Sequence, residues 1–430
     1  MKRYRKEQLN PAELKLLCKR PGAEYSEILP VLNNVLQEVL VRGDNALREF
    51  TKKFDNATVS EFRVSENEFE QARSCVSQKT KDAILSASDA IKKYHECQLP
   101  KPFNIKTEPG VECWMEWRAI QRVGLYIPGG SAPLISTVLM LGIPATIAGC
   151  NEIILCTPPS SNGSISSEIL FAGESLGIKN VFKVGGAQAI TALAVGTESI
   201  HKVDKIFGPG NRYVSAMKSL VAQPPTNVSI DMIAGPTELL IIADETSNPA
   251  WIAADLLSQA EHGADSQVVL VTTSELLAEH VEKEIAHQLT TLPRHTIAEE
   301  ALEKSFVLVV KDLDDAFEFS NEYAPEHLSV AIENAEIYSN LITNAGSVFM
   351  GTRSSVVFGD YASGTNHTLP TSGFAKSVGG ITVQNFMKPI FFQSISELGL
   401  SSLGEIVTTL ARAERLEAHA QAIEKRIGKQ

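Results

Sequence analysis

Short apolar runs alternate with longer helical segments from about residue 126 onward, at the spacing of β–α–β units. The apolar runs are continuous and do not alternate with polar residues, which is typical of parallel strands covered by helices on both faces. The runs expected as strands are 152–156, 180–184, 205–207, 239–243, 267–272, 306–310, 328–332 and 347–350. Because these strands are too many for one compact open sheet, the sequence predicts an α/β fold with two doubly wound layers and a boundary near Gly235-Pro236.

The two ends of the chain follow other patterns. Residues 1 to about 125 are mainly helical at first and then give a strand pair around Val111 to Tyr126. A helix is expected from about Leu403 to Ile427, with small or apolar residues at seven-residue spacing. At ~1.5 Å per residue this helix would be ~35 Å long, enough to leave its own globule and lie on another subunit. Packing on its own chain is the alternative.

Charge and composition exclude several classes of protein. Acidic residues outnumber basic ones 51 to 39 for a formal net charge of -12, and the basic residues are scattered, so nucleic acid is not an expected partner. The uncharged stretch from Val123 to Asn151 is interrupted by Gly and Pro, which favours a buried helix over a membrane span. Without a secretory signal or a Cys-x-x-Cys pair, we expect reduced thiols in the cytoplasm or in an organelle of similar redox poise. Cys150 and Cys156 adjoin an apolar strand, where a packed thiol is expected more often than a nucleophile.

Two pairs of residues have the types and spacing needed for metal binding or proton transfer. Gln259 and His262 are three apart on a predicted helix ending at Gly263, so both could hold one ion, although a His near a helix end is usually a surface or capping residue. Glu326 and His327 place a carboxylate beside an imidazole. In a regular strand these two would point to opposite faces, so a joint role requires irregular backbone. An exposed pair at a strand start is the plainer interpretation.

Two further segments carry candidate ligands. Asp360 and His367 lie on a loop rich in Gly and small hydroxyl residues, and Asp360 offers a hard oxygen ligand. A polar surface loop is the alternative. Glu414 and His419 lie on the expected C-terminal helix, where alone they indicate a solvated face.

Dinucleotide binding has no Gly-x-Gly-x-x-Gly motif to support it. Three glycine turns instead follow strands and precede helices, and these turns contain Tyr126, Gln188 and Asn211. Each turn could present backbone N–H groups and a helix N-terminus to a phosphate. Each could equally be a tight β–α turn.

Taken together, these segments resemble the histidinol dehydrogenase family. The segments that match this family are residues 123–134, 185–189, 207–211, 231–236, 258–262, 325–328, 360–367 and 413–416. One fragment would be weak, but this ordered set covers nearly the whole chain. The resemblance implies a zinc-dependent, NAD-using homodimer that oxidises L-histidinol through L-histidinal to L-histidine in histidine biosynthesis.

The resemblance also implies roles for individual residues. The zinc ligands would be Gln259, His262, Asp360 and His419, the last donated by the partner subunit. His327 would be the base for the alcohol proton, and Glu326 would activate water on the aldehyde. Further substrate contacts would come from Thr237, His367 and Glu414, alongside His327 and the zinc ligands, and NAD contacts from Tyr126, Gln188 and Asn211. Position 237 is Thr where the family commonly has Ser, which keeps the hydroxyl and adds a methyl group.

The implied fold has two incomplete Rossmann-like domains and a C-terminal tail that embraces the partner. We expect an N-terminal helical arm over 1–25, a first domain from 26–125 with 238–380 that carries most of the zinc site, a second domain over 126–237, and a dimerisation tail over 381–430. A zinc hydrolase that uses Glu326 to activate water without a nicotinamide is the main rival. An α/β ligand-binding module without turnover is the other.

Overall fold

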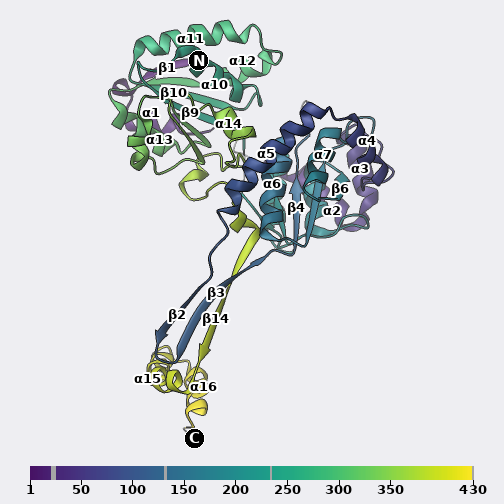
Figure 1. Cartoon of the computed structure of the whole chain (residues 1–430), viewed down its shortest axis with the longest axis vertical. Coiled ribbons are helices and arrows are strands. Elements are labelled where there is room, and N and C mark those ends of the chain that lie inside the picture. Colours follow the sequence, from purple (N-terminus) through teal and green to yellow (C-terminus); the bar gives the residue numbers. More distant parts are fainter. Residues whose placement is uncertain (21–25, 130–132, 233–234, 429–430) are drawn as a thin grey trace.

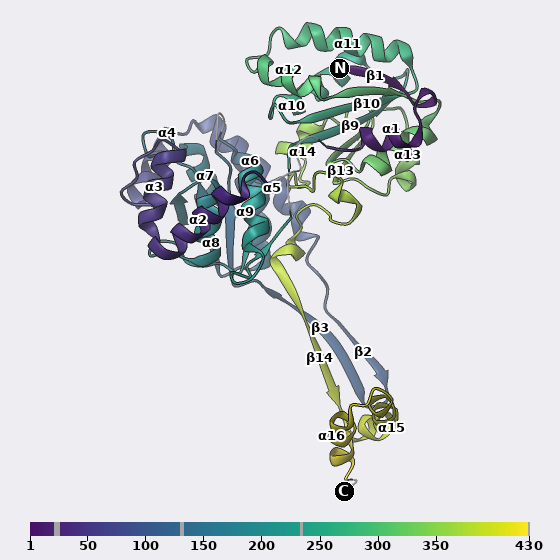
Figure 2. The same cartoon turned by 180° about the vertical axis from the view of Figure 1, so that it is seen from behind.

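The computed structural model describes residues 1–20, 26–129, 133–232 and 235–428. Two α/β lobes lie side by side, and a long narrow stalk extends from the region where they meet (Figure 1). The N-terminus lies in one lobe, and the C-terminus lies at the far end of the stalk. The view from behind shows the same separation of lobes and stalk (Figure 2).

The six-stranded lobe contains one parallel sheet in the order β1-β11-β10-β9-β12-β13. The strands are β1 (Lys2–Arg5), β9 (Glu238–Ala243), β10 (Gln267–Thr272), β11 (Phe306–Val309), β12 (His327–Val330) and β13 (Ser347–Met350). The helices are α1 (Pro11–Leu17), α10 (Pro249–Ala260), α11 (Glu275–Leu289), α12 (His295–Glu303), α13 (Leu313–Tyr323) and α14 (Val356–Tyr361). Two apolar cores fill the two faces of this sheet, because alternate residues of β9 and β10 enter opposite layers.

The five-stranded lobe contains a second parallel sheet in the order β6-β5-β4-β7-β8. The strands are β4 (Arg122–Tyr126), β5 (Glu152–Thr157), β6 (Asn180–Lys183), β7 (Lys205–Phe207) and β8 (Ser229–Ile230). The helices are α2 (Leu29–Arg42), α3 (Asp44–Phe54), α4 (Glu66–Cys75), α5 (Gln78–Glu96), α6 (Ile135–Ala148), α7 (Ser167–Ser175), α8 (Gly186–Val195) and α9 (Arg212–Val221).

The strand order reverses at the first strand of each parallel run. In the five-stranded sheet β4 lies between β5 and β7, and in the six-stranded sheet β9 lies between β10 and β12. Such a switch point leaves a crevice between the connections that leave to opposite faces, and ligands of doubly wound folds bind in this crevice. Each lobe therefore has one place where a site is expected.

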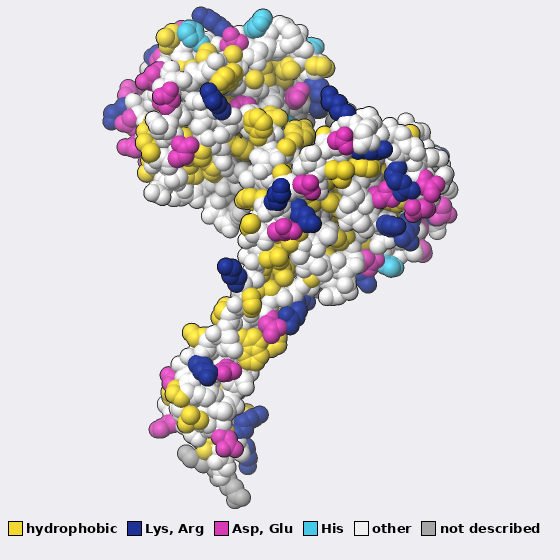
Figure 3. Space-filling view, in the orientation of Figure 1, with side chains coloured by type: hydrophobic (Ala, Val, Ile, Leu, Met, Phe, Trp, Pro, Cys, Tyr) yellow, Lys and Arg dark blue, Asp and Glu magenta, His cyan; other side chains and the backbone are white. Residues whose placement is uncertain are grey.

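The stalk is an antiparallel sheet in the order β14-β3-β2, formed by β2 (Phe103–Glu108), β3 (Val111–Ala119) and β14 (Met387–Ile395). Helices α15 (Glu397–Ala413) and α16 (Glu417–Ile427) cover its far end (Figure 1). Large apolar side chains remain exposed along it, including Phe103, Phe391 and Leu410 at 53%, 77% and 60% exposure. Figure 3 shows hydrophobic side chains along the stalk.

The strands expected after residue 126 are confirmed to within a residue or two at each end, and the boundary near Gly235-Pro236 separates the two parallel sheets. The uncharged stretch contains the largely buried helix α6, with Pro144 inside it. In the part of the chain that the structure describes, no helix is both long and apolar enough to cross a membrane.

The expected grouping of the N-terminal segments differs from the structure. Residues 2–5 form an edge strand beside β11 rather than part of a helical arm, while α1 is helical as expected and residues 21–25 lie outside the described residues. Helices α2–α5 join the five-stranded lobe, not the lobe of residues 238–380, because their apolar faces pack into the two cores around β4–β7. Amphipathic spacing shows that a helix buries one face, but not which sheet receives it.

Two expectations about local elements are also corrected. The strand pair around Val111 to Tyr126 is not a pair, since β3 belongs to the stalk and β4 to the five-stranded sheet. The single helix from Leu403 to Ile427 is broken between α15 and α16, where Arg415 has a φ of 61°. The two helices then pack on each other, with Gly404 of α15 directly against Ile427 of α16.

Candidate active site

The carboxylate of Glu326 and the imidazole of His327 lie together in the six-stranded lobe, and both residues are buried. The backbone of Glu238 links them: its N–H donates to Glu326 Oε2 at 2.9 Å, and its carbonyl accepts from His327 Nδ1 at 3.0 Å. His327 Nδ1 also lies 3.4 Å from Glu326 Oε2. Because Glu326 precedes β12 and only His327 is in the regular strand, the two side chains reach each other despite adjacent positions.

His327 is oriented by this arrangement. A carbonyl oxygen only accepts hydrogen bonds, so Nδ1 carries the hydrogen and Nε2 points toward Asp360, whose Oδ1 lies 3.7 Å away. Nε2 is buried and has no hydrogen-bond partner among the described residues. Burial opposes protonation of His327, but the carboxylates of Glu326 and Asp360 outweigh it and raise its pKa to about 9. A buried ring nitrogen without a partner requires an explanation, and a role in catalysis or ligand binding is one.

A buried ion pair supports the backbone of Glu238. The Arg20 guanidinium donates from Nε and Nη2 to the two carboxylate oxygens of Glu238, at 3.0 Å and 2.9 Å, and stacks 3.5 Å from the centre of the Tyr323 ring. The N–H of Ser372 donates to the same carboxylate at 2.6 Å. A bidentate pair restricts both partners, so it holds the strand start that fixes Glu326 and His327.

Three of the four expected zinc ligands converge beside His327. Gln259 is fully buried at the end of α10, and its Nε2 donates to Asp360 Oδ2 at 3.0 Å. His262 follows α10, which ends at Ala260 rather than at Gly263. Its ring is reachable by water, yet neighbouring protein atoms desolvate it enough to lower its pKa, against the charge of Asp360.

His367 joins this group from the loop after α14. Its Nε2 lies 3.0 Å from the hydroxyl of Ser136 on α6, so the residue bridges the two lobes. Burial lowers the pKa of His367, and Asp360, His327 and His262 all act on it electrostatically. Thr237 lies directly before Glu238 and is partly buried.

Glu414 and His419 lie far from these residues in the same chain. Both are exposed at the tip of the stalk, where Glu414 caps α15 and His419 is in the first turn of α16 (Figure 1). Within the described residues, no group of three or more His, Cys, Asp or Glu side chains is placed to hold a metal ion. One chain therefore brings together Gln259, His262 and Asp360, but not His419.

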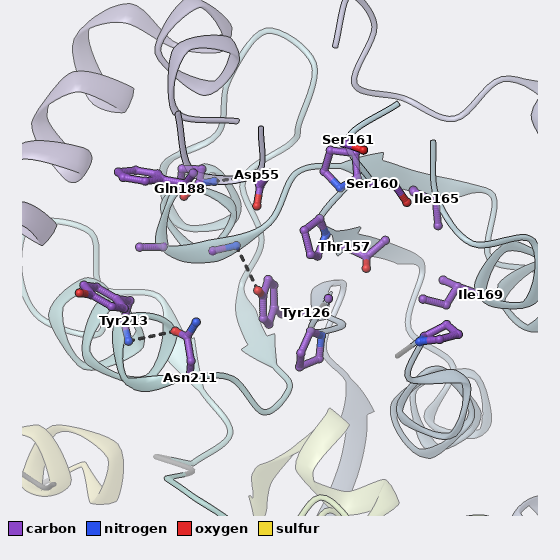
Figure 4. A pocket seen from close by; sticks show the side chains of 18 of the residues that line it. Asp55, Tyr126, Thr157, Ser160, Ser161, Ile165, Ile169, Gln188, Asn211 and Tyr213 are labelled. Atoms are coloured by element: carbon purple, nitrogen blue, oxygen red, sulfur yellow. Dashed lines mark hydrogen bonds between the residues drawn. The ribbon is translucent and has the colours of Figure 1, made fainter. Parts of the chain in front are cut away.

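A cavity of about 750 Å³ opens at the carboxyl ends of the strands of the five-stranded sheet. Tyr126 ends β4, Gln188 is in the first turn of α8, and Asn211 caps α9, so all three residues expected to contact NAD line this cavity (Figure 4). The Gly186 N–H donates to the Tyr126 hydroxyl at 3.0 Å. The cavity lies at the switch point beside β4, and its volume is in the range typical of cofactor sites.

Glycine is required in the turn that carries Asn211. A side chain at Gly208, which has a φ of 127°, would place its Cβ 2.1 Å from the carbonyl oxygen of Tyr126. The Gly208 N–H donates to Asp231 at 2.8 Å, and Lys218 donates to the Gly208 carbonyl at 2.9 Å and forms a buried ion pair with Asp231. This turn is therefore held rigidly against β4.

Two residues of these sites were not found from the sequence. Glu238 acts through its backbone, which leaves no motif. Asp55 follows α3 and lines the cavity beside Gln188, whose Nε2 donates to its Oδ2 at 3.2 Å (Figure 4). Its sequence position, about 70 residues before the first glycine turn, carries no signal of this contact.

Cys150 and Cys156 are packed thiols, as expected from the apolar strand beside them. All six cysteines are free, and burial raises the pKa of Cys150 to about 12 and that of Cys156 further. A thiol with so high a pKa is a poor nucleophile.

Comparison with known proteins extends this picture. The family model described as histidinol dehydrogenase matches residues 18–427. The chain is 47% identical over 411 residues to histidinol dehydrogenase of Bacteroides thetaiotaomicron, with 96% of each chain covered, and 48% identical over 412 residues to that of Escherichia coli K12, with 96% and 94% covered. The crystal structure of histidinol dehydrogenase from Elizabethkingia anophelis superposes with a TM-score of 0.96 at 47% identity, covering 100% of this chain and 98% of that one.

Two doubly wound lobes define an α/β architecture. The cavity of the five-stranded lobe lies at its switch point, at the carboxyl ends of the strands, whereas Glu326 and His327 lie at the amino end of β12, opposite to the position expected in the six-stranded lobe. The chain belongs to the histidinol dehydrogenase family. This membership confirms the resemblance found in the sequence and the expected class of enzyme, an oxidoreductase.

Proposed function

We propose that this protein catalyses the last step of histidine biosynthesis, the zinc-dependent oxidation of L-histidinol through L-histidinal to L-histidine with two NAD. The observation that carries the proposal is the buried Glu326–His327 pair, joined through the backbone of Glu238 and facing Gln259 and Asp360. A family member with a carboxylate, an imidazole and metal-type ligands in one place has the groups that the two oxidations require.

The overall reaction assigns different proton transfers to the two steps. Oxidation of the alcohol removes a hydride equivalent and the hydroxyl proton, and His327 Nε2 is the unpartnered group placed to take that proton. Oxidation of the aldehyde adds the oxygen of water, and Glu326 is the carboxylate placed to activate it. Over both steps, the alcohol, one water and two NAD give the carboxylate, two NADH and three protons.

The donor set fits a zinc ion shared between subunits. Gln259, His262 and Asp360 supply an amide oxygen, an imidazole and a carboxylate, and the last two are ordinary zinc ligands. His419 is the fourth ligand that we propose, donated by the partner. When bound, zinc would hold the imidazole and amine of the substrate, and its charge would oppose the raised pKa of His327.

The stalk supports the proposed homodimer. Its exposed apolar residues, such as Phe391, Leu398 and Leu410, lie on an element that extends away from its own lobes, with Glu414 and His419 at the tip (Figures 1 and 3). A second copy of the chain would cover these apolar residues and receive His419 and Glu414 in its active site, beside Thr237 and His367.

The cavity of the five-stranded lobe is the proposed NAD site. It gathers Tyr126, Gln188 and Asn211 from three separate turns. NAD would supply the oxidising power, while these side chains and the backbone of α8 would orient it. A cytoplasmic location stays a prediction.

The proposal is tested by following NADH absorbance after adding L-histidinol and NAD to the zinc-loaded protein. Two NADH per histidinol are expected, and a chelator should remove activity that zinc restores. His262→Ala should lose both zinc and activity, while His280→Ala, an exposed histidine on α11, should keep both. Hydrolysis of an ester or amide without NADH formation would favour the zinc hydrolase, and binding without turnover would favour the ligand-binding module.

A further inference from the structure

The nucleotide cavity contains one side chain that its proposed role has not used. Asp55 is the only charged residue among the described residues that line the cavity, and none of these lining residues is Lys or Arg. The remaining polar groups are hydroxyls, amides and backbone N–H groups. The cavity therefore offers one negative charge and no cationic side chain to any ligand.

Asp55 lies beside the start of α8. Gln188, in the first turn of that helix, donates to the Asp55 carboxylate at 3.2 Å, and no side chain caps the helix N-terminus at Gly185. In doubly wound folds the diphosphate of a dinucleotide binds at such a helix N-terminus, and a nearby carboxylate accepts hydrogen bonds from the adjacent ribose hydroxyls. The usual carboxylate at the end of the second strand is absent from the described residues, since β5 ends in Thr157 and continues into Pro158 and Pro159.

We propose that Asp55 is the residue that makes the cavity select NAD over NADP, by accepting hydrogen bonds from a ribose of the cofactor and repelling a 2′-phosphate. The proposal rests on the cavity being the NAD site. A 2′-phosphate brings a charge of about −1.5 to −2, and binding it normally requires an Arg or Lys. Here it would meet the carboxylate of Asp55 without a cation to compensate. The selectivity for NAD over NADP would thus come from the residue that follows α3, and not from the end of a strand.

The test compares NADH and NADPH binding in Asp55→Asn, followed by nucleotide fluorescence, with kcat/KM for NAD and NADP as a second readout. Asparagine keeps the size of the side chain and an oxygen to accept from Gln188. We expect the preference for NADH over NADPH to fall roughly tenfold or more, since a charge-assisted hydrogen bond is lost and a repulsion is removed. Glu61→Gln removes one charge from an exposed position of the same lobe and should leave the preference unchanged.

The outcomes separate this inference from the proposed function. An unchanged NADH-to-NADPH preference in Asp55→Asn would overturn the role of Asp55, whatever the activity. If the unsubstituted protein binds NADH tightly and discriminates through Asp55 but does not oxidise L-histidinol, the proposed function fails and the inference stands. If the unsubstituted protein binds NADPH as well as NADH, the inference is overturned.

Discussion

Replacing Asp55 by asparagine is expected to make the nucleotide-free protein more stable at pH 7. Burial raises the pKa of Asp55 from its ordinary 3.8 to about 6, although the hydrogen bond from Gln188 acts in the opposite direction. The groups that face the carboxylate are the Gln188 amide and the Tyr126 phenol, whose own pKa is raised by burial and by Asp55. At neutral pH the folded protein therefore carries a carboxylate that it holds less favourably than the unfolded chain does.

The size of the effect follows from the two pKa values. A pKa of about 6 in place of 3.8 corresponds to about 3 kcal/mol at pH 7 for a fully buried carboxylate. Because Asp55 is only partly buried, water screens the charge, and about 1 to 1.5 kcal/mol is expected. This would raise the Tm by about 2 to 5 °C for a domain of this size. Because the folded pKa is raised, the original protein loses stability as the pH rises from about 3.8 to about 6. The Asp55→Asn protein has no carboxyl group at this position and does not lose this stability.

The assay is thermal unfolding of both proteins without nucleotide, at pH 7, 5 and 4. The difference should be largest at pH 7 and much smaller near pH 4, where Asp55 is protonated in the folded protein and about half protonated in the unfolded chain. Glu61→Gln should show no such pH-dependent gain. A lower Tm at pH 7, or a gain that is as large at pH 4 as at pH 7, would refute the reasoning. A gain would show that the charge of Asp55 lowers the stability of the nucleotide-free protein, as is common at functional positions.

Three further outcomes are expected. First, the His262→Ala and His419→Ala proteins should each be inactive. When the two are unfolded, mixed in equal amounts and refolded, roughly a quarter of the normal activity should return, because each heterodimer has one intact site. Heterodimers without activity would exclude the shared site. Second, His327→Ala should slow oxidation of L-histidinol, while Glu326→Gln should chiefly slow oxidation of added L-histidinal; the reverse pattern would exchange their roles. Third, Lys218→Met should cost about 3 to 5 kcal/mol in urea unfolding by leaving its buried carboxylate partner unpaired; a change below about 1 kcal/mol would show that water reaches the pair.

Local pattern predicted the strands well because both sheets are parallel and buried on both faces. Residues 267–272 and 347–350 were placed at their observed bounds, since continuous apolar runs between turn residues leave little choice. The lobe that receives α2–α5 could not be predicted, because an amphipathic face fits either sheet. The stalk strands β2 and β14 were missed for the opposite reason. Both are exposed along much of their length; β2 has no continuous apolar run, and the apolar run of β14 is short and begins with Pro389.

The residues of the candidate site were also only partly predictable from the sequence. Motifs pointed to Gln259, Asp360 and the Glu326–His327 pair, which the fold brings together, and their chemical roles stay predictions. They could not find Glu238 or Asp55, because one acts through its backbone and the other comes from a segment distant in sequence. The break at Arg415 was also not visible, although it turns α16 back on α15 and so sets the direction in which His419 faces.

The cavity and the Glu326–His327 site lie in different lobes, so the contacts between the lobes determine how far apart the two sites are. The cavity lies at the carboxyl ends of one sheet, whereas Glu326 and His327 lie at the amino end of β12 in the other, so neither sheet alone fixes the distance between them. The loop after α14 helps to fix this distance through the buried residue Asn366. The Asn366 amide donates to the Met140 carbonyl at 2.6 Å and lies 3.2 Å from His95 Nε2.

His95 suits this junction because burial lowers its pKa, which favours the neutral ring at neutral pH. A neutral imidazole offers one donor and one acceptor, so it can satisfy the Asn366 amide without bringing a buried charge between the lobes. Directional hydrogen bonds, unlike apolar contact, fix position as well as proximity. Since His367 is the next residue, the same bonds that join the lobes also help to position the imidazole that we propose to contact the substrate.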